Sequence, residues 1–322
     1  MILKSFQQVF PHTSLWVASN CLNKHGLILG SLEPLQIDFA RVAQVMERPA
    51  IKKDLADIAI LDVYDLLDCF VCDETAIRQM ATGAAINSDD RPRLEFSCAR
   101  RMPWKARLLQ TLAMLTLYHS PVSACVTNLP QPKVNQAEMA RRFEASTHIL
   151  RALVQQLARN PISRRQEMDL ALQCIPGHPH VRSCDAELER EILDLRQVLA
   201  KYPRSKTLSA ALAEKLFLAL KYDESAALYE WLLKVDSTPP PNAFTDLARI
   251  QFSRGESGAA EQTLLKCLVR WPGSAEAHDL LGGIYFKAGR IADARRHNEQ
   301  AMRLEPGNQI YAEHYALVSL KK

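Results

Sequence analysis

Two adjacent carboxylates in the stretch NSDDRPRLEF (residues 87–96) have side chains suited to acid–base chemistry. A general acid and a general base must converge on one pocket, with their pKa values pushed apart. Asp89 and Asp90 are direct neighbours, and direct neighbours in a strand point to opposite faces. The stretch therefore favours a capped turn in which an Asp pairs with a nearby Arg, and Pro92 fixes the chain before an inward-facing strand.

A second candidate is a metal site in CIPGHPHVRSC (residues 174–184), because thiolate and imidazole are ligands that tetrahedral zinc binds. The candidate ligands are Cys174, His178, His180 and Cys184. The spacing C-x3-H-x-H-x3-C differs from the common finger spacings, so a loop between helices, rich in Gly, Pro and His, is the alternative. Our main prediction contains no metal and no cofactor.

A third candidate is the CxxC spacing of Cys69 and Cys72. A redox-active pair of this kind lies at a helix N-terminus after a strand. Here the pair lies within DLLDCFVCDE, for which we predict an apolar helix, so core packing is the expected role. The chain also lacks a nucleophile-elbow motif. We predict no catalytic residue.

Composition narrows the classes of protein. The chain has 322 residues, of which 48% are hydrophobic and 24% charged, as in globular proteins. A net charge of +4 without a basic stripe does not favour nucleic-acid binding. No segment reaches the roughly 18–20 apolar residues of a transmembrane helix, and the first residues do not resemble a signal peptide. We therefore expect a cytoplasmic protein whose eight cysteines are reduced.

An internal repeat occupies the C-terminal third, where residues 241–274 align with 275–308 without a gap. The aligned pairs with a mechanical role are Ala248/Gly282, Ala260/Ala294, Gly255/Gly289 and Pro272/Pro306. The small residues allow two antiparallel helices to approach, the glycines end the first helix and the prolines stop the second. The period predicts a helical-hairpin solenoid.

This pattern resembles the tetratricopeptide repeat, with Leu281, Gly282, Tyr285, Ala294 and Pro306 in the family's places. Residues 206–240 form a third, degenerate repeat, in which Ala226 aligns with Ala260 and Lys221 replaces the glycine. Residues 310–322 are the predicted capping helix.

The resemblance implies a partner groove lined by the first helices of the repeats. The expected lining residues are Asn242, Thr245, Arg249, Phe252, Asp279, Phe286 and Lys287. The Lys/Asn/Arg set with which some family members clamp a C-terminal carboxylate is missing, so no peptide class follows. Two alternatives stay open: the array binds a separate protein or peptide, or it packs on its own protein or builds a dimer.

The N-terminal third predicts an incomplete sheet. Residues 10–18 and 25–32 predict two strands joined by a hairpin-like link, and residues 33–47 predict a helix. The second strand is almost wholly apolar, so we expect it to be buried with neighbours on both sides. A two-stranded hairpin is not stable alone. Further along, a helix over residues 135–160 is predicted to carry an Arg pair on its solvent face.

The ordered motifs FPHTSLW, HGLILGS, PLQIDFARV, DLLDCFV and NSDDRPRLEF resemble the C-terminal part of bacterial spermidine-synthase-like proteins. That family implies a Rossmann-like sheet that ends in an antiparallel edge, often fused to a membrane-embedded half. The family's Gly-rich nucleotide turn is absent, since residues 1–100 hold only Gly26, Gly30 and Gly83. Either the reading frame is truncated or another chain, which can be membrane-embedded, supplies the missing half.

The prediction is a mostly α protein in three parts. Residues 1–100 are an incomplete Rossmann-like α/β fragment, residues 101–205 a helical connector, and residues 206–322 a tetratricopeptide-like α-solenoid. We expect a non-catalytic protein-interaction protein derived from the C-terminal part of a spermidine-synthase-like protein. The alternative is the tail of a split or truncated aminopropyltransferase-type enzyme of polyamine biosynthesis, active only with its nucleotide-binding half.

Overall fold

The computed structural model describes residues 2–17, 26–86 and 104–321. Asp89, Asp90 and the whole stretch 87–96 lie outside the described residues. The chain divides into two compact units, Met1–Ala186 and Glu187–Lys322. The predicted boundaries at residues 100 and 205 stay a prediction.

A small antiparallel sheet organises the first unit. Its strands are β1 (His12–Val17), β2 (Gly26–Ser31) and β4 (Phe70–Cys72), in the order β2-β1-β4. β1 and β2 pair from His12↔Ser31 to Val17↔Gly26, which confirms the predicted hairpin. A two-stranded parallel sheet joins β3 (Ile37–Asp38) to β5 (Val126–Thr127). The Rossmann-like assignment of this part stays a prediction.

The expectation that the second strand is buried between two neighbours is wrong for the described residues. β2 lies at the edge of its sheet and pairs with β1 only. Leu27 is 65% exposed and Leu29 is 47% exposed. Apolar composition predicts burial only where a second layer or strand covers the residue, and here Ile28, on the other face, is the side chain that packs against the core.

The predicted helix across the CxxC pair is also wrong. α4 (Val63–Leu67) stops before it, β4 carries Cys72, and α5 (Glu74–Met80) begins after it. Asp73 explains the break, because its side chain accepts a hydrogen bond from the Ala76 amide and so starts a new helix. The expected core role of Cys69 and Cys72 is confirmed by their burial, and burial raises the pKa of the Cys72 thiol to about 12.

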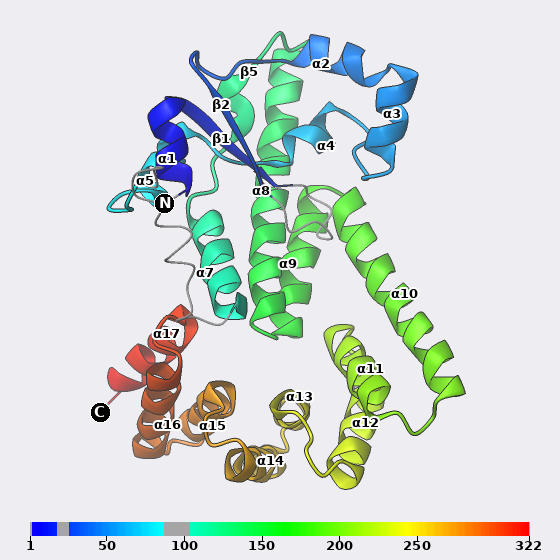
Figure 1. The fold of residues 1–322 in the computed structure, drawn as a ribbon, viewed down its shortest axis with the longest axis vertical. Coiled ribbons are helices and arrows are strands. Elements are labelled where there is room, and N and C mark those ends of the chain that lie inside the picture. Colours follow the sequence, from blue (N-terminus) through cyan, green and yellow to red (C-terminus); the bar gives the residue numbers. More distant parts are fainter. Residues whose placement is uncertain (1, 18–25, 87–103, 322) are drawn as a thin grey trace. The chain divides into compact units, whose positions relative to one another are not determined.

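Helices make up most of the remainder of the first unit (Figure 1). They are α1 (Ile2–Val9), α2 (Phe39–Met46), α3 (Pro49–Ala56), α4, α5, α7 (Trp104–Leu117), α8 (Pro132–Leu157), α9 (Pro161–Cys174) and the start of α10 (Pro179–Lys201). α8 and α9 lie antiparallel and pack closely, because Ala145, Ala152 and Ala171 between them have no exposed surface. α8 is therefore the central element of this unit.

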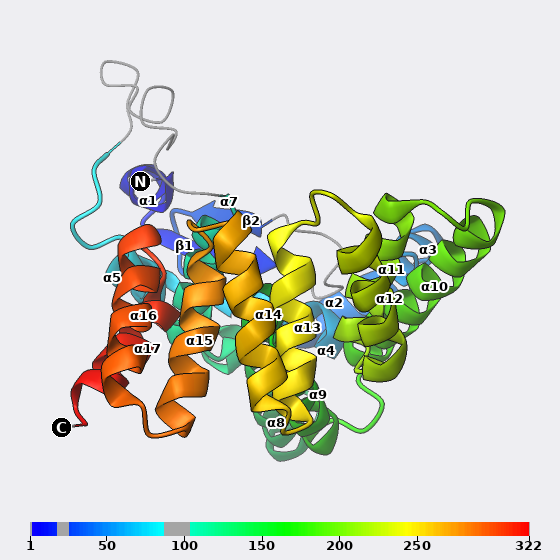
Figure 2. The ribbon, with the colours of Figure 1, turned by 90° about the horizontal axis from the view of Figure 1, so that it is seen from below.

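The second unit is an array of helical hairpins (Figure 2). Its elements are the remainder of α10, then α11 (Lys206–Leu218) with α12 (Tyr222–Val235), α13 (Pro241–Ser253) with α14 (Ser257–Arg270), α15 (Ala275–Lys287) with α16 (Ile291–Leu304), and α17 (Gln309–Ser319). Each hairpin contacts the next. The predicted hairpins and the terminal helix are confirmed, and Gly255 and Gly289 adopt the left-handed φ values of +82° and +76° that were expected of them.

The degenerate repeat differs from its expected register by one residue. Leu220, not Lys221, takes the left-handed position, with φ +60°. Ser225, not Ala226, is the fourth residue of its helix, as Ala260 and Ala294 are of theirs, and it is fully buried. A longer connection before α13 causes the shift, because it adds one residue between hairpins and leaves the packing within each hairpin unchanged.

A helix contact in the last hairpin generates a stability prediction. Gly282 on α15 lies against the buried side chain of Asn298 on α16, and a Cβ at Gly282 would collide with that amide. We expect Gly282→Ala to lower the free energy of unfolding by about 1–3 kcal/mol through overpacking. Denaturant unfolding of the whole chain followed by circular dichroism measures this change.

The adjacent Gly283 is the matched control, because open space surrounds its Cβ position on the same helix. Gly283→Ala is expected to raise the free energy of unfolding by up to about 1 kcal/mol through higher helix propensity. Equal effects of the two substitutions would contradict the close contact between α15 and α16.

Candidate functional site

The first helices of the hairpins form the face that was predicted to be a groove. Arg249, Phe252 and Phe286 are partly buried there, and Lys287 is exposed. Asn242 is also partly buried. Thr245 is fully buried, with its hydroxyl donating to the Asn242 carbonyl at 3.4 Å. Thr245 therefore offers no surface to a partner and supports the array from inside.

Two lysines cover two aromatic rings on this face. The Lys287 Nζ on α15 lies 4.9 Å from the Phe252 ring centroid on α13. The Lys321 Nζ, just after α17, lies 4.8 Å from the Phe286 ring centroid on α15. A cation over a ring is held by the ring quadrupole, and the attraction is small where solvent reaches it. The face therefore presents two half-buried rings, each with an exposed ammonium group above it.

Two ion pairs link the same helices. Arg249 Nη2 lies 3.1 Å from Glu276 Oε1, which joins α13 to α15. His314 Nδ1 lies 2.8 Å from Asp279 Oδ1, which joins α15 to α17. The hydrogen bond to Asp279 raises the pKa of His314 and favours its charged form. Asp279 is thus paired with a residue of the array itself, and only 8% of its surface is exposed.

Sequence reasoning missed Glu276, His314 and Lys321 as members of this face. The sequence did contain a signal for these residues, which is their spacing. His314 follows its partner Asp279 by 35 residues. A spacing of one repeat plus one residue places two side chains opposite each other on successive first helices. Reading the sequence at that spacing finds the Phe252–Lys287 and Phe286–Lys321 pairs as well.

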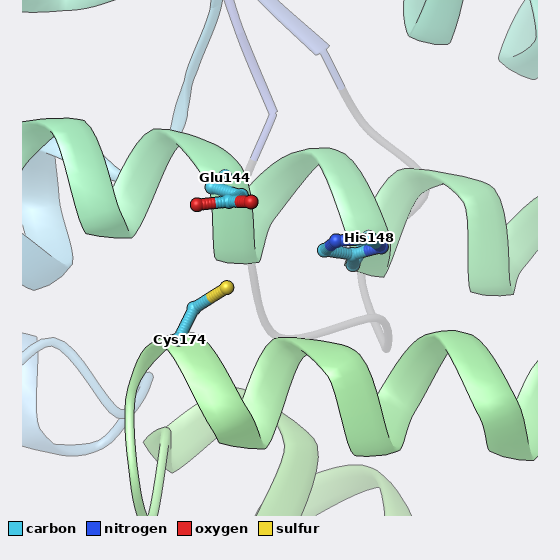
Figure 3. A group of neighbouring side chains, drawn as sticks. All are labelled: Glu144, His148 and Cys174. Atoms are coloured by element: carbon cyan, nitrogen blue, oxygen red, sulfur yellow. The ribbon is translucent and has the colours of Figure 1, made fainter.

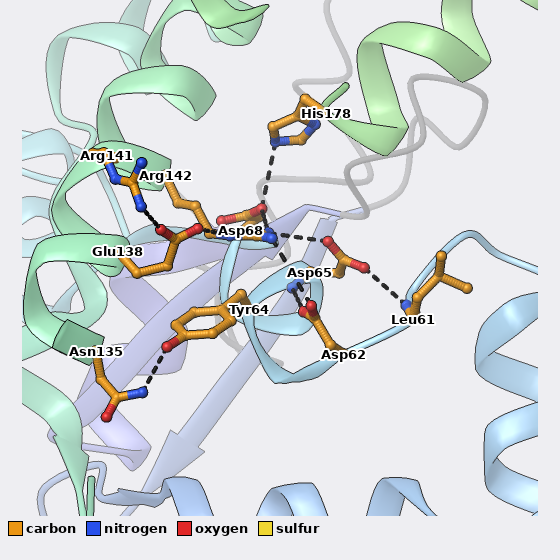
Figure 4. Close-up of polar contacts among 10 residues, drawn as sticks. All are labelled: Leu61, Asp62, Tyr64, Asp65, Asp68, Asn135, Glu138, Arg141, Arg142 and His178. Atoms are coloured by element: carbon orange, nitrogen blue, oxygen red, sulfur yellow. Dashed lines mark hydrogen bonds and ion pairs between the residues drawn. The ribbon is translucent and has the colours of Figure 1, made fainter. Parts of the chain in front are cut away.

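The described members of the predicted set of four metal ligands fall into two surroundings. Cys174 ends α9 and Cys184 lies on α10, and both pack against the apolar cluster between α8 and α9. His178 is buried and points to Asp68, with Nε2 3.4 Å from Asp68 Oδ2 (Figure 4). The side chain of His180 lies outside the described residues. A zinc site formed by all four of these residues therefore stays a prediction.

Cys174 has other neighbours that could ligate a metal (Figure 3). Its Sγ lies within 4.8 Å of ligand atoms of Glu144 and His148, both on α8. The His148 Nδ1 in turn lies 2.6 Å from Glu167 Oε2 on α9. No sequence motif indicated this group, because its members come from two helices that are brought together by packing.

A buried charge network joins α8 to α4 (Figure 4). The Arg142 Nη1 lies 3.0 Å from Asp65 Oδ1 and 2.7 Å from Asp68 Oδ2, and its Nε donates to Glu138 Oε1 at 3.1 Å. The guanidinium also lies over the Tyr64 ring at 5.1 Å. The expectation that both arginines of the pair face solvent is wrong for Arg142, because these carboxylates draw it into the interior.

An apolar cavity of about 460 Å³ lies in the first unit, between β1, β2, α7 and α8. Its wall is mainly aliphatic, from Leu15, Ile28, Leu112, Leu115, Leu150 and Leu153. His119 also lines the cavity, and burial lowers the pKa of this imidazole to about 4, so it is neutral near pH 7. Among the described helices, none has both the length and the apolar character needed to cross a membrane.

The Arg142 network generates a second stability prediction. The carboxylates of Asp65 and Asp68 are 7% and 5% exposed, so removing their partner leaves buried charge uncompensated. We expect Arg142→Met to lower the free energy of unfolding by about 3–5 kcal/mol. The neighbouring Arg141 is 60% exposed and contacts only the Glu138 end of the network in the described structure.

Arg141→Met is therefore the matched control and should change the free energy of unfolding by less than about 0.5 kcal/mol. Chemical denaturation of both variants compares them. A small effect of Arg142→Met, similar to that of Arg141→Met, would show that the network does not stabilise the first unit.

Comparisons with known proteins complete the description. No protein-family model and no curated protein matches the chain. Among solved structures, the chain resembles one in Naa15/Naa10 bound to HypK-THB, with 15% identity, a TM-score of 0.34, and coverage of 71% of this chain and 38% of the other. It also resembles one in the APC/C hetero-tetramer Cut9–Hcn1, with 13% identity, a TM-score of 0.39, and coverage of 87% and 52%. The chain thus spans about two fifths of the length of the first of these chains and about half of the length of the second.

Proposed function

We propose that the chain is a protein-interaction protein whose tetratricopeptide-like array binds a peptide segment of a partner. The observation that carries the proposal is the face of α13, α15 and α17, on which Phe252 and Phe286 are each covered by a lysine of the following repeat. Half-buried rings on a rigid helical scaffold are suited to hold a side chain of a partner, since aromatic anchors dominate binding energy in protein interfaces.

The charges on this face favour an acidic partner. Arg249 and Asp279 are already paired with Glu276 and His314 within the array. Lys287 and Lys321 are exposed and lie over rings, so a carboxylate can approach each ammonium group without first breaking an ion pair of the described structure. We therefore propose an acidic peptide that also carries an aromatic or aliphatic side chain. Packing of the face on a second copy of the chain is the other use of the same surface.

A finer proposal concerns the first unit, as the C-terminal part of a spermidine-synthase-like protein. The ordered motifs support it, and so does the antiparallel pairing of β1 with β2. Among the described residues β2 pairs with β1 alone, and its Leu27 and Leu29 are exposed, which favours the second candidate function. In that function the chain is the tail of an aminopropyltransferase-type enzyme, and a nucleotide-binding half on another polypeptide extends the sheet.

Peptide selection tests the interaction proposal. A random peptide library displayed on phage is selected against the full chain, and single enriched peptides are measured by calorimetry. We expect enriched sequences to combine Asp or Glu with an aromatic or aliphatic residue. Lys287→Glu should weaken their binding about tenfold or more, because it places like charges opposite each other. Lys321→Glu should act in the same direction.

Lys266→Glu is the matched control, because Lys266 is an exposed lysine on the second helix α14. It should leave peptide binding unchanged. Enriched peptides that tolerate Lys287→Glu and Lys321→Glu would overturn the assignment of the face. Light scattering tests the alternative that the face binds a second copy of the chain. A wild-type dimer that becomes a monomer in the Lys287→Glu variant would identify the face as a self-association surface.

Calorimetry with decarboxylated S-adenosylmethionine tests whether this chain itself carries the cofactor site, which both candidate functions place elsewhere or leave out. We expect the chain alone to bind this adenosine derivative no more tightly than about millimolar, because its sequence carries no Gly-rich turn of the cofactor-binding type. Binding clearly tighter than that would contradict our expectation that the cofactor site belongs to another half. S-adenosylhomocysteine in the same titration controls for binding that any S-adenosyl compound would show.

A further inference from the structure

Three side chains of different ligand types converge between α8 and α9. Glu144 and His148 are four residues apart on α8 and therefore share one face of the helix. Cys174 is the last residue of α9, the antiparallel neighbour of α8 (Figure 3). One ligand atom from each of the three lies within 4.8 Å of the other two. The close packing of the two helices at Ala145 and Ala171 holds this distance.

The surroundings of His148 orient its ring. Its Nδ1 lies 2.6 Å from the Glu167 Oε2. In the tautomer whose Nδ1–H donates to this carboxylate, Nε2 is the nitrogen that can bind a metal. A carboxylate behind the imidazole is the arrangement that commonly fixes a metal-binding histidine and makes it more basic. Glu167 comes from α9, so the same helix pair supplies ligands and support.

We propose that Glu144, His148 and Cys174 bind a zinc ion, with Glu167 as the positioning residue for His148. A thiolate, an imidazole and a carboxylate are all ligands of zinc, whereas magnesium and calcium prefer oxygen only. Three protein ligands leave the fourth tetrahedral position to water. Glu144 is exposed and the other two ligands are half-buried, so an ion in solution can reach the group.

The geometry requires only a local adjustment. Ligand atoms around tetrahedral zinc lie roughly 3.3–3.6 Å apart, given its bond lengths. The observed separations of up to 4.8 Å can shorten to this range by side-chain rotation, since Glu144 is exposed and Cys174 ends its helix. The charges also balance, because the Glu144 carboxylate and a Cys174 thiolate together neutralise the two positive charges of the ion.

Binding is coupled to loss of one proton. Zinc is ligated by a thiolate, so a Cys174 thiol must lose its proton when the metal binds. Zinc replaces this proton: the S–H bond breaks, the sulfur keeps the electron pair and forms the Zn–S bond, and the proton goes to solvent. The affinity for zinc should therefore rise with pH across the neutral range.

The candidate set read from the sequence shares one member with this site. Cys174 belongs to both sets, whereas His178 points to Asp68 and Cys184 lies on α10. The two sets make different predictions for substitution. Loss of Glu144 or His148 should weaken binding only at the site between α8 and α9, and loss of Cys184 should weaken binding only at the set of residues 174–184.

Titration of the full chain tests the site. Protein freed of metal with a chelator, and kept reduced with a phosphine, is titrated with Co²⁺ and then with Zn²⁺. We expect one equivalent of Co²⁺ to bind and to produce a thiolate-to-cobalt charge-transfer absorption in the near ultraviolet. One equivalent of Zn²⁺ should remove that absorption. No charge-transfer band at one equivalent of Co²⁺ would overturn the proposal.

Substitutions then assign the ligands. Cys174→Ser should abolish the charge-transfer band, and His148→Gln and Glu144→Gln should each weaken Co²⁺ binding at least about tenfold. Glu167→Gln should weaken binding by about 10–100-fold while keeping the thiolate band, because it acts only through His148. Circular dichroism of each variant confirms that the helices remain, so a loss of binding is not a loss of fold.

Two cysteine controls complete the test. Cys125→Ser removes a half-buried thiol on another segment and should leave the titration unchanged. Cys184→Ser should also leave it unchanged. If Cys184→Ser abolishes the thiolate band while Glu144→Gln and His148→Gln do not weaken binding, the segment of residues 174–184 binds the metal and the present assignment is wrong.

Discussion

Close approach of antiparallel helices through small side chains is the constraint on which both units of this protein depend. Ala145, Ala152 and Ala171 are fully buried between α8 and α9. Ser225, Ala260 and Ala294 occupy the equivalent place in the three hairpins of the array and are nearly or completely buried. Large side chains at these places would separate the helices and expose the leucines that flank them. The candidate sites inherit their geometry from these contacts.

Buried charge adds specificity to the first unit. Arg142 draws Asp65 and Asp68 from α4 onto α8, and Tyr64 lies under the same guanidinium. A buried ion pair contributes little net stability, because both charges lose their hydration. Removing one partner is nevertheless costly, because the other charge stays buried without a counter-charge or water. The network therefore favours one docking of α4 on α8. The short β4 follows α4 directly and pairs with β1, so the position of the sheet depends on this docking.

The two candidate sites differ in how they are built. The face of the array combines residues one repeat apart, so each contact joins successive first helices and can recur along the solenoid. The group of Glu144, His148 and Cys174 occurs once, at the point where α9 ends beside α8. A peptide-binding face gains from repetition over a long surface, whereas a metal ion needs convergence on one point.

The sequence alone determined the repeat array, because a 34-residue period, two glycines at hairpin turns and small residues at helix contacts are local signals. It also determined the hairpin of β1 and β2, since two short strand-like runs and the link between them are neighbours along the chain. Its local signals were not sufficient for the strand at Phe70–Cys72, where the cap at Asp73 and pairing with β1 overrode apolar periodicity. They also placed Thr245 on the groove and Arg142 in solvent, because periodicity does not identify which neighbour covers a face.

Only the tertiary structure decided which chemical groups meet. Cys174 was identified from its sequence neighbours, His178 and Cys184, yet its spatial neighbours are Glu144 and His148 from another helix. Lys287 and Lys321 were brought over the rings of Phe252 and Phe286 by the stacking of repeats. The physical reason is the same in both cases. Spacing along one helix specifies which side chains share a face, whereas the partner of that face is selected by packing between elements distant in sequence.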